Sequence, residues 1–218
     1  MKTATLLMLC LSAAAWAERP ELSASFGFAS ELMTSSQYDL VSADDPLRMY
    51  RVAAAGTFAA PRGHVDVELG WRSGAASATA HGTLSSSLWV RGVDVSAGYR
   101  FAWLKHLEPY ARAGVGLDWA SLSLTGSSAL EQTVLHPSGT FLGGLQFPFA
   151  LGVGAPGGLA FVVDLGVGYV VRPAYTFDAL APPPPSGRQE DPIARGAVNL
   201  GSMPLSGFTW RLGVTVRL

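Results

Sequence analysis

The sequence predicts an all-β fold, an eight-stranded antiparallel up-and-down β-barrel, and three observations support it. Eight segments alternate apolar residues with small or polar ones at a period of two, which separates the two faces of a strand. Short and long connections between these segments also alternate along the chain. Glycine is abundant, with 25 in 218 residues, as suits a narrow barrel whose strands curve and pack closely.

The first seventeen residues are predicted to be a signal peptide. Lys2 precedes the apolar run "ATLLMLCLSAAA", and Ala15-Trp16-Ala17 has an A-x-A cleavage pattern. We therefore expect residues 1–17 to be removed and residues 18–218 to form the barrel domain. An uncleaved membrane helix and a lipoprotein modified at Cys10 are the alternatives. The run is short for a membrane span, and Leu9 is large for a lipoprotein site. Without this segment the chain has no cysteine, so no disulfide is expected.

The eight predicted strands follow in chain order. Each carries apolar side chains at alternate positions, as in the last, where Phe208, Trp210, Leu212, Val214, Val216 and Leu218 alternate with polar or glycine residues. The segments are 22–32, 50–58, 65–72, 93–103, 111–119, 141–151, 159–172 and 207–218.

The connections between these strands fall into two classes. "APRG" (60–63), "KHLEP" (105–109) and "GAPGG" (154–158) are short, rich in Pro and Gly, and follow the second, fourth and sixth strands. Long connections are predicted at 35–46, 73–84, 125–138 and 179–205. A meander with short turns at one rim and long loops at the other has this form.

The residues between the apolar positions indicate which face meets water. They are mostly Gly, Ala, Ser and Thr, with a few charges whose signs nearly cancel, six acidic against seven basic. Buried charges must be paired to be tolerated. We therefore predict a charge network inside the lumen, formed by Glu31, Arg51, Asp66, Glu68, Arg72, Asp94, Arg100, Arg112, Asp118, Asp164, Arg172, Arg211 and Arg217.

The apolar face is accordingly predicted to face lipid, which makes the barrel a transmembrane one. Bulky aromatic residues near the strand ends fit the two aromatic belts of such a barrel. These are Phe58, Trp103, Phe149 and Phe161 toward the short turns, and Trp89, Trp119, Tyr169 and Trp210 toward the long loops. Charged residues make up only 14% of the chain, against about 25% in an average soluble protein.

On these features the chain resembles the small eight-stranded outer-membrane β-barrel proteins of Gram-negative bacteria, the OmpA/OmpX-like superfamily, over the barrel only. The resemblance implies the outer membrane as location, periplasmic termini, extracellular long loops, and contact with outer-membrane lipid and lipopolysaccharide. It also implies that the assembly machinery recognises the last strand, usually through a final aromatic residue. This chain departs from that pattern because it ends at Leu218.

Three functions are considered. The first is a non-enzymatic barrel with a charge-plugged lumen, whose outer loops, above all 179–205 with its "PPPP", are available for surface or envelope interactions. The second is a lipid A-modifying hydrolase, because a deacylase of the superfamily uses a His-x-Ser pair with a carboxylate, and His136, Ser138 and Glu131 supply these types. The third is a soluble periplasmic carrier of the lipocalin type. No cofactor or metal is expected, and the net charge of −1 argues against nucleic-acid binding.

Overall fold

The protein is a closed barrel of eight antiparallel strands, which confirms the predicted fold class. The computed structural model describes residues 20–33, 35, 38–42, 44, 46–80, 84–102, 104, 106–125, 129–150, 159–177 and 201–218. The predicted signal peptide lies outside these residues and stays a prediction. In the part of the chain described, no helix is long and apolar enough to span a membrane.

The barrel strands run β1 (Glu21–Met33), β2 (Pro46–Ala60), β3 (Gly63–Ala80), β4 (Leu84–Phe101), β5 (Glu108–Thr125), β6 (Ala129–Ala150), β7 (Ala160–Val171) and β10 (Gly207–Arg217). A 3-10 turn, η1 (Tyr38–Leu40), lies between β1 and β2. A small hairpin of β8 (Tyr175–Thr176) and β9 (Ser202–Met203) lies between β7 and β10.

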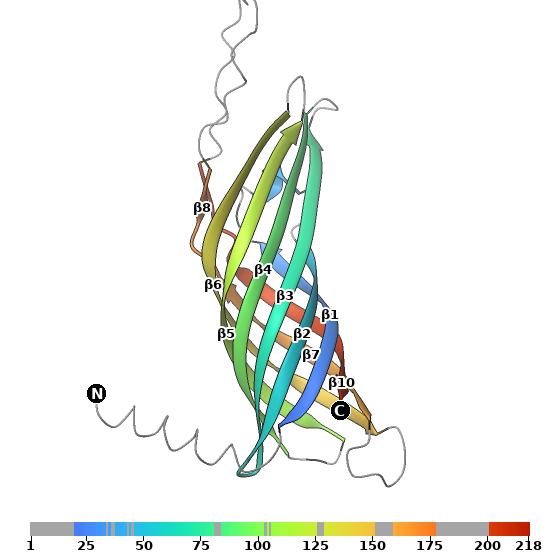
Figure 1. Ribbon diagram of the computed structural model, residues 1–218. Helices are drawn as coiled ribbons and strands as arrows, with labels where there is room; N and C mark the ends of the chain where they lie inside the picture. The colour runs from blue at the N-terminus through green and yellow to red at the C-terminus, as the bar shows by residue number, and fades with distance from the viewer. Residues whose placement is uncertain are drawn as a thin grey trace, which may run out of the picture.

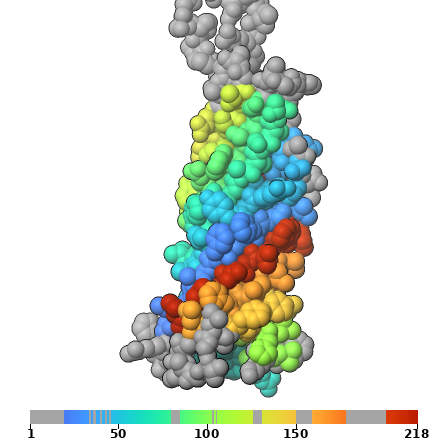
Figure 2. All heavy atoms as spheres, turned by 90° about the vertical axis from the view of Figure 1, so that its right-hand side faces the viewer, coloured from blue at the N-terminus to red at the C-terminus, as the bar shows by residue number. Residues whose placement is uncertain are grey.

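Consecutive barrel strands are hydrogen-bonded neighbours, and the ring closes between the first and the last. Phe26 of β1 lies opposite Val214 of β10, and the same residue lies opposite Val52 of β2. Figure 2 shows β1, β10 and β7 as adjacent bands inclined across one side of the molecule. The terminal amphipathic strand therefore completes the barrel.

The connections differ from the prediction at two places. Residues 61–62 form the expected tight turn, Leu104 and Leu107 pair across the turn before β5, and "GAPGG" lies outside the described residues. The long loops predicted at 73–84 and 125–138 are wrong, because β3 and β4 are separated only by residues 81–83 and β5 and β6 only by 126–128. We call the end with residues 61–62 the turn rim and the opposite end the loop rim.

The four strands β3 to β6 are longer than a bilayer requires. They contain 18, 18, 18 and 22 residues, whereas about 9–11 tilted residues cross the hydrocarbon core. Their additional residues project past β2 and β7 at the loop rim, as Figure 1 shows. Ala129–Ser138 of β6 lies beyond the last residue of β7 that pairs with it, Val171 opposite Gly139.

The polarity of the two faces reverses where these strands leave the barrel. On the outward face of β5, Val115 and Leu117 are 72% and 46% exposed, but Ser121 and Ser123 occupy the same face further along. Inside, charged residues give way to buried apolar ones after Asp118. The strands continue without a break through this reversal. A prediction that requires the outward positions to be apolar along the whole strand therefore ends the strand too early.

Apolar side chains fill the interior at the loop rim. The 3-10 turn, the β8–β9 hairpin and the extended strands pack against one another there, so this end is covered by protein. We call this cluster the loop-rim core, and its buried members are Met33, Tyr38, Val41, Leu47, Met49, Leu88, Val90, Ala120, Leu122, Tyr175, Phe177, Met203 and Leu205.

Most of the predicted belt aromatics lie on the outward face. The exposed ones are Trp89, Trp119, Phe149, Tyr169 and Trp210, at 37–57%. Phe58 and Phe161 are half-buried, and Trp103 lies outside the described residues.

Candidate functional site

The candidate site is the charged lumen below the loop-rim core. The thirteen residues predicted for it each form at least one ion pair, with one another or with Glu108. Counting Glu108, seven carboxylates face seven arginines, so the set is neutral. All fourteen side chains are at most 15% exposed, although they come from seven different strands and the segment after β7.

Near the turn rim, Glu108 joins two arginines. It accepts hydrogen bonds from Arg100 at 2.6 Å and from Arg217 at 3.0 Å. Arg100 also donates to Asp66 at 2.8 and 3.0 Å, and Asp66 accepts a further bond from the Thr57 hydroxyl at 2.7 Å. Every charge of this group is therefore paired.

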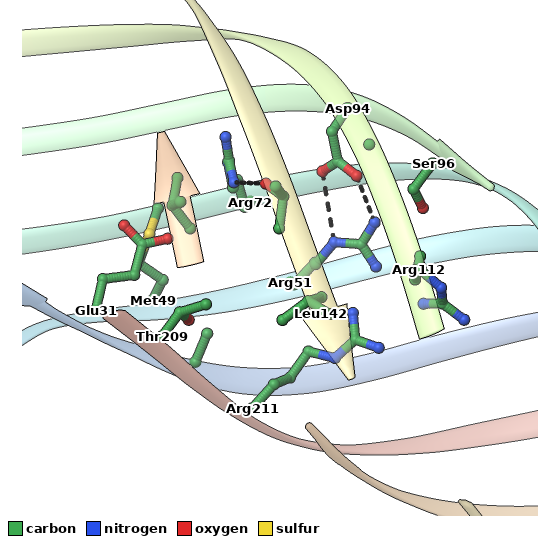
Figure 3. Close-up of a pocket in the computed structure, with 14 residues that line it drawn as sticks. Glu31, Met49, Arg51, Arg72, Asp94, Ser96, Arg112, Leu142, Thr209 and Arg211 are labelled. Atoms are coloured by element: carbon green, nitrogen blue, oxygen red, sulfur yellow. Dashed lines mark hydrogen bonds and ion pairs between the residues drawn. The ribbon is translucent and has the colours of Figure 1, made fainter. Parts of the chain in front are cut away.

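In the middle of the lumen the ion pairs bridge the barrel. Arg51 pairs with Glu68 and, at 2.6 Å, with Asp94; Figure 3 shows the latter pair beside the cavity. Arg112 donates to both oxygens of Glu68 at 3.0 and 2.9 Å. Because Glu68 serves two arginines, loss of one carboxylate here disturbs more than one pair.

The opposite wall of the same layer is organised by Asp164. It accepts hydrogen bonds from Arg211 at 3.2 Å, from the Tyr110 hydroxyl at 2.9 Å and from Gln146 at 2.8 Å. Gln146 in turn accepts from Arg217 at 2.6 Å, which links this wall to the turn-rim group. The network thus extends across most of the lumen.

A separate group lies directly beneath the loop-rim core and is centred on Asp118. Its side chain is fully buried and accepts bonds from Arg72 Nη2 at 2.8 Å and from Arg172 Nε at 2.6 Å. Arg172 also donates to Glu31 at 2.6 Å and to the Leu205 carbonyl at 2.8 Å. The two arginines and two carboxylates form a neutral unit that ties β1, β3 and β5 to the segment before β10.

Arg172 also fixes this segment through its backbone. Its N–H donates to the Ser206 hydroxyl and its carbonyl accepts from the same hydroxyl, both at 2.8 Å. Tyr175, three residues later, is buried in the loop-rim core, and this burial raises the pKa of its phenol above the usual value. The phenol therefore stays neutral well into alkaline solution.

Glycine at position 92 makes room for the central carboxylate. A Cβ on Gly92 would overlap Asp118 Oδ1 and lie 2.9 Å from the Leu117 carbonyl oxygen. Asp118 cannot retreat, because two arginines hold it. The absence of a side chain at position 92 is thus a packing requirement of the site.

Two small cavities lie within the lumen. A cavity of about 40 Å³ is lined by Arg51, Arg72, Asp94, Arg112 and Arg211 among others, and one of about 20 Å³ lies among Glu68, Gln146 and Asp164. The larger has room for about three water molecules. Figure 3 draws the residues that line the larger cavity, among them Arg112 and Arg211.

The structure does not assemble the predicted hydrolase residues into a catalytic group. His136 and Ser138 lie in β6, where a loop was expected, and face the interior, whereas Glu131 is exposed on the alternate face of that strand. The Ser138 hydroxyl accepts a hydrogen bond from Arg72 at 2.8 Å. The His136 ring instead packs edge-on against Tyr175 at 4.7 Å.

Among the described residues, no group of three or more metal-binding side chains is placed to hold a metal ion.

Three residues of the lumen network were not predicted from the sequence: Glu108, Tyr110 and Gln146. Glu108 was assigned to a turn. It lies four residues before Arg112 and therefore on the same face of β5, so a predicted strand that began at residue 108 would have included it in the lumen.

No protein-family model matches the chain, and no curated protein matches it in sequence. Ail, the attachment invasion locus protein of Yersinia pestis, in complex with the heparin analogue sucrose octasulfate, shares 16% identity at a TM-score of 0.52, covering 92% of this chain and 100% of Ail. A second Ail structure shares 17% identity over the same fractions at a TM-score of 0.50. The chain therefore has the eight-stranded barrel fold of Ail, and the predicted resemblance to small outer-membrane barrels is confirmed at the level of the fold.

Proposed function

We propose that this chain is a non-enzymatic outer-membrane β-barrel whose outward wall contacts lipid. One observation carries the proposal: large apolar side chains point outward while the charges of the lumen network are buried. Phe28, Leu69 and Phe141 are 58%, 62% and 60% exposed, whereas Asp118 and Asp164 are 0% and 3% exposed. A water-soluble barrel has the opposite polarity, and apolar patches on such a scale mark a membrane or partner surface.

The lumen is proposed to be closed by its ion pairs. Seven arginines against seven carboxylates leave no net charge to attract an ion of either sign. The cavities of about 40 and 20 Å³ hold a few water molecules at most. An eight-stranded barrel filled in this manner is a structural or interacting protein rather than a porin.

The proposed orientation is the one that the resemblance to small outer-membrane barrels implies. The first residue of β1 and the last of β10 lie near the turn rim, since Glu21 is opposite Thr57 and Ser23 opposite Arg217. We place this rim in the periplasm and the projecting strands outside, with the loop rim available for envelope or surface contacts. Recognition of β10 by the assembly machinery belongs to the same proposal. The loop first favoured for contact, 179–205, lies mostly outside the described residues.

The two alternatives fit the interior less well. A lipocalin-type carrier needs an apolar cavity inside the barrel, but the observed lumen is charged and nearly filled. A hydrolase of the predicted type needs a carboxylate to orient the histidine, and Glu131 lies on the other strand face.

Fractionation of producing cells tests the location, and gel mobility tests the barrel. The outer-membrane fraction is run on SDS gels with and without boiling, and a faster unboiled band is expected from a closed barrel. A soluble protein without a mobility shift would contradict the proposal. Planar-bilayer recording of the same protein should show no large steady conductance steps, and such steps would contradict the closed lumen alone.

A further inference from the structure

The outward face of β4 near the loop rim carries an arginine, Arg91, that is not part of the lumen network. Of the arginines in the described residues, seven lie in the lumen, Arg48 pairs with Asp44 at 3.8 Å, and Arg62 lies in the turn after β2. Arg91 instead is exposed on the outward face of β4 and forms no ion pair in the described part of the chain.

Arg91 lies where the outward wall changes from apolar to polar. Val93, two residues toward the turn rim, is 38% exposed and belongs to the apolar wall. In the other direction, toward the loop rim, Trp89 is followed on the same face by Ser87 and Ser85. On the proposed function, this level is the boundary between the hydrocarbon and the headgroups of the outer leaflet.

Aromatic side chains surround Arg91 at this level. Its guanidinium lies 5.1 Å from the ring centre of Trp89, and Trp119 lies directly opposite it on β5. Tyr50 and Trp71 continue the cluster on β2 and β3, with ring centres 5.5 Å apart. We call these five residues the rim patch. All four aromatic residues are 37–44% exposed, so the patch is open to whatever covers the wall.

A guanidinium at a lipid boundary needs an anionic partner, because removing it from water without one is unfavourable. Arginine presents a planar set of donors that matches a phosphate, and tryptophan and tyrosine settle at headgroup depth. Stacking on Trp89 leaves the guanidinium edge free to donate.

We propose that the rim patch binds the phosphate group of an anionic lipid of the outer leaflet, with Arg91 donating to the phosphate oxygens and the aromatic residues contacting the glycerol or sugar and upper acyl chain. This inference rests on the proposed membrane function and specifies one of its lipid contacts. A lipid rather than free phosphate is favoured because the patch is continuous with the apolar wall.

Native mass spectrometry of the refolded full chain in neutral detergent tests the proposal. The probes are phosphatidic acid, diacylglycerol with the same acyl chains, and inorganic phosphate as competitor. Phosphatidic acid should bind more tightly than diacylglycerol, and Arg91→Gln should weaken it roughly fivefold. Arg91→Lys should retain part of the affinity. Arg62→Gln, which removes an exposed arginine at the other rim, should leave it unchanged.

Equal binding of the two lipids, or no effect of Arg91→Gln, would overturn the proposal. Displacement of phosphatidic acid by millimolar inorganic phosphate would overturn the assignment to a lipid. Insertion of each variant into zwitterionic vesicles is measured in parallel by the gel-mobility shift. Failure of the unmodified chain to insert would refute the membrane function itself, whereas normal insertion without phosphate selectivity refutes only this site.

Discussion

Asp118→Asn perturbs the lumen where the structure makes the clearest quantitative prediction. Asp118 is fully buried and holds Arg72 through three contacts of 2.8–3.1 Å and Arg172 through one of 2.6 Å. Arg172 keeps Glu31 as a partner after the substitution, but Arg72 keeps only the hydroxyls of Ser138 and Thr140. One buried guanidinium therefore loses its counter-charge.

Breaking a buried ion pair by removing one partner costs about 3–5 kcal/mol. Because the asparagine oxygen still accepts one hydrogen bond, we expect the lower end, about 3 kcal/mol. The matched control is Asp44→Asn, whose carboxylate is 71% exposed and pairs with Arg48 at 3.8 Å. Such a surface pair contributes about 0–1 kcal/mol.

The assay is urea unfolding of the refolded protein in phospholipid vesicles, followed by tryptophan fluorescence and by the gel-mobility shift. The double variant Asp118→Asn with Arg72→Gln should be more stable than the sum of the single effects predicts, because it removes the orphaned charge. A free energy of unfolding for Asp118→Asn within about 0.5 kcal/mol of the unmodified protein would mean that Arg72 does not depend on this counter-charge.

Three further predictions concern single positions. Gly92→Ala should destabilise the barrel by about 1–3 kcal/mol, because the new methyl group overlaps Asp118, whereas Gly56→Ala, with 3.7 Å to its nearest neighbour, should be tolerated; urea unfolding compares them. Burial raises the pKa of Tyr175, so the folded state favours the neutral phenol. Above a pH of about 10 the phenol ionises in the unfolded chain but not in the folded one, and the free energy of unfolding therefore falls. The free energy of unfolding of Tyr175→Phe should therefore rise relative to that of the unmodified protein as the pH increases from 9 to 11. A difference that stays constant over this range would contradict the expectation. Overproduction of the chain should leave lipid A acylation unchanged by mass spectrometry, and acyl loss that Ser138→Ala abolishes would restore the hydrolase hypothesis.

The fold could be predicted from the sequence because each barrel strand alternates apolar and polar residues over much of its length. In β10 the alternation persists from Phe208 to Val216, and the structure pairs every residue of that stretch with β1. The boundaries of β4 and β6 could not be placed in the same manner. Their outward face turns from apolar to polar at the loop rim, so a single hydrophobic face does not follow the whole strand.

The lumen residues could also be found from the sequence, because alternation assigns each charge to a face. Their partners could not. Arg172 contacts Glu31, 141 positions away, through barrel closure, and no local spacing specifies such a pair. The spacing of His136 and Ser138 also suggested the wrong partner. Both side chains face the interior, but the Ser138 hydroxyl accepts a hydrogen bond from Arg72.

The environment of the outward face of β5 shows most directly whether the outward wall lies in lipid. The chain has one cysteine, Cys10, which is lost if the predicted signal peptide is removed, so single cysteines can be placed at Val115, Leu117, Ser121 and Ser123 and spin-labelled in vesicles. Labels at 115 and 117 are expected to be reached by oxygen from the lipid, and labels at 121 and 123 by a water-soluble relaxation agent. Equal access of the water-soluble agent to all four positions would contradict an outward wall in lipid.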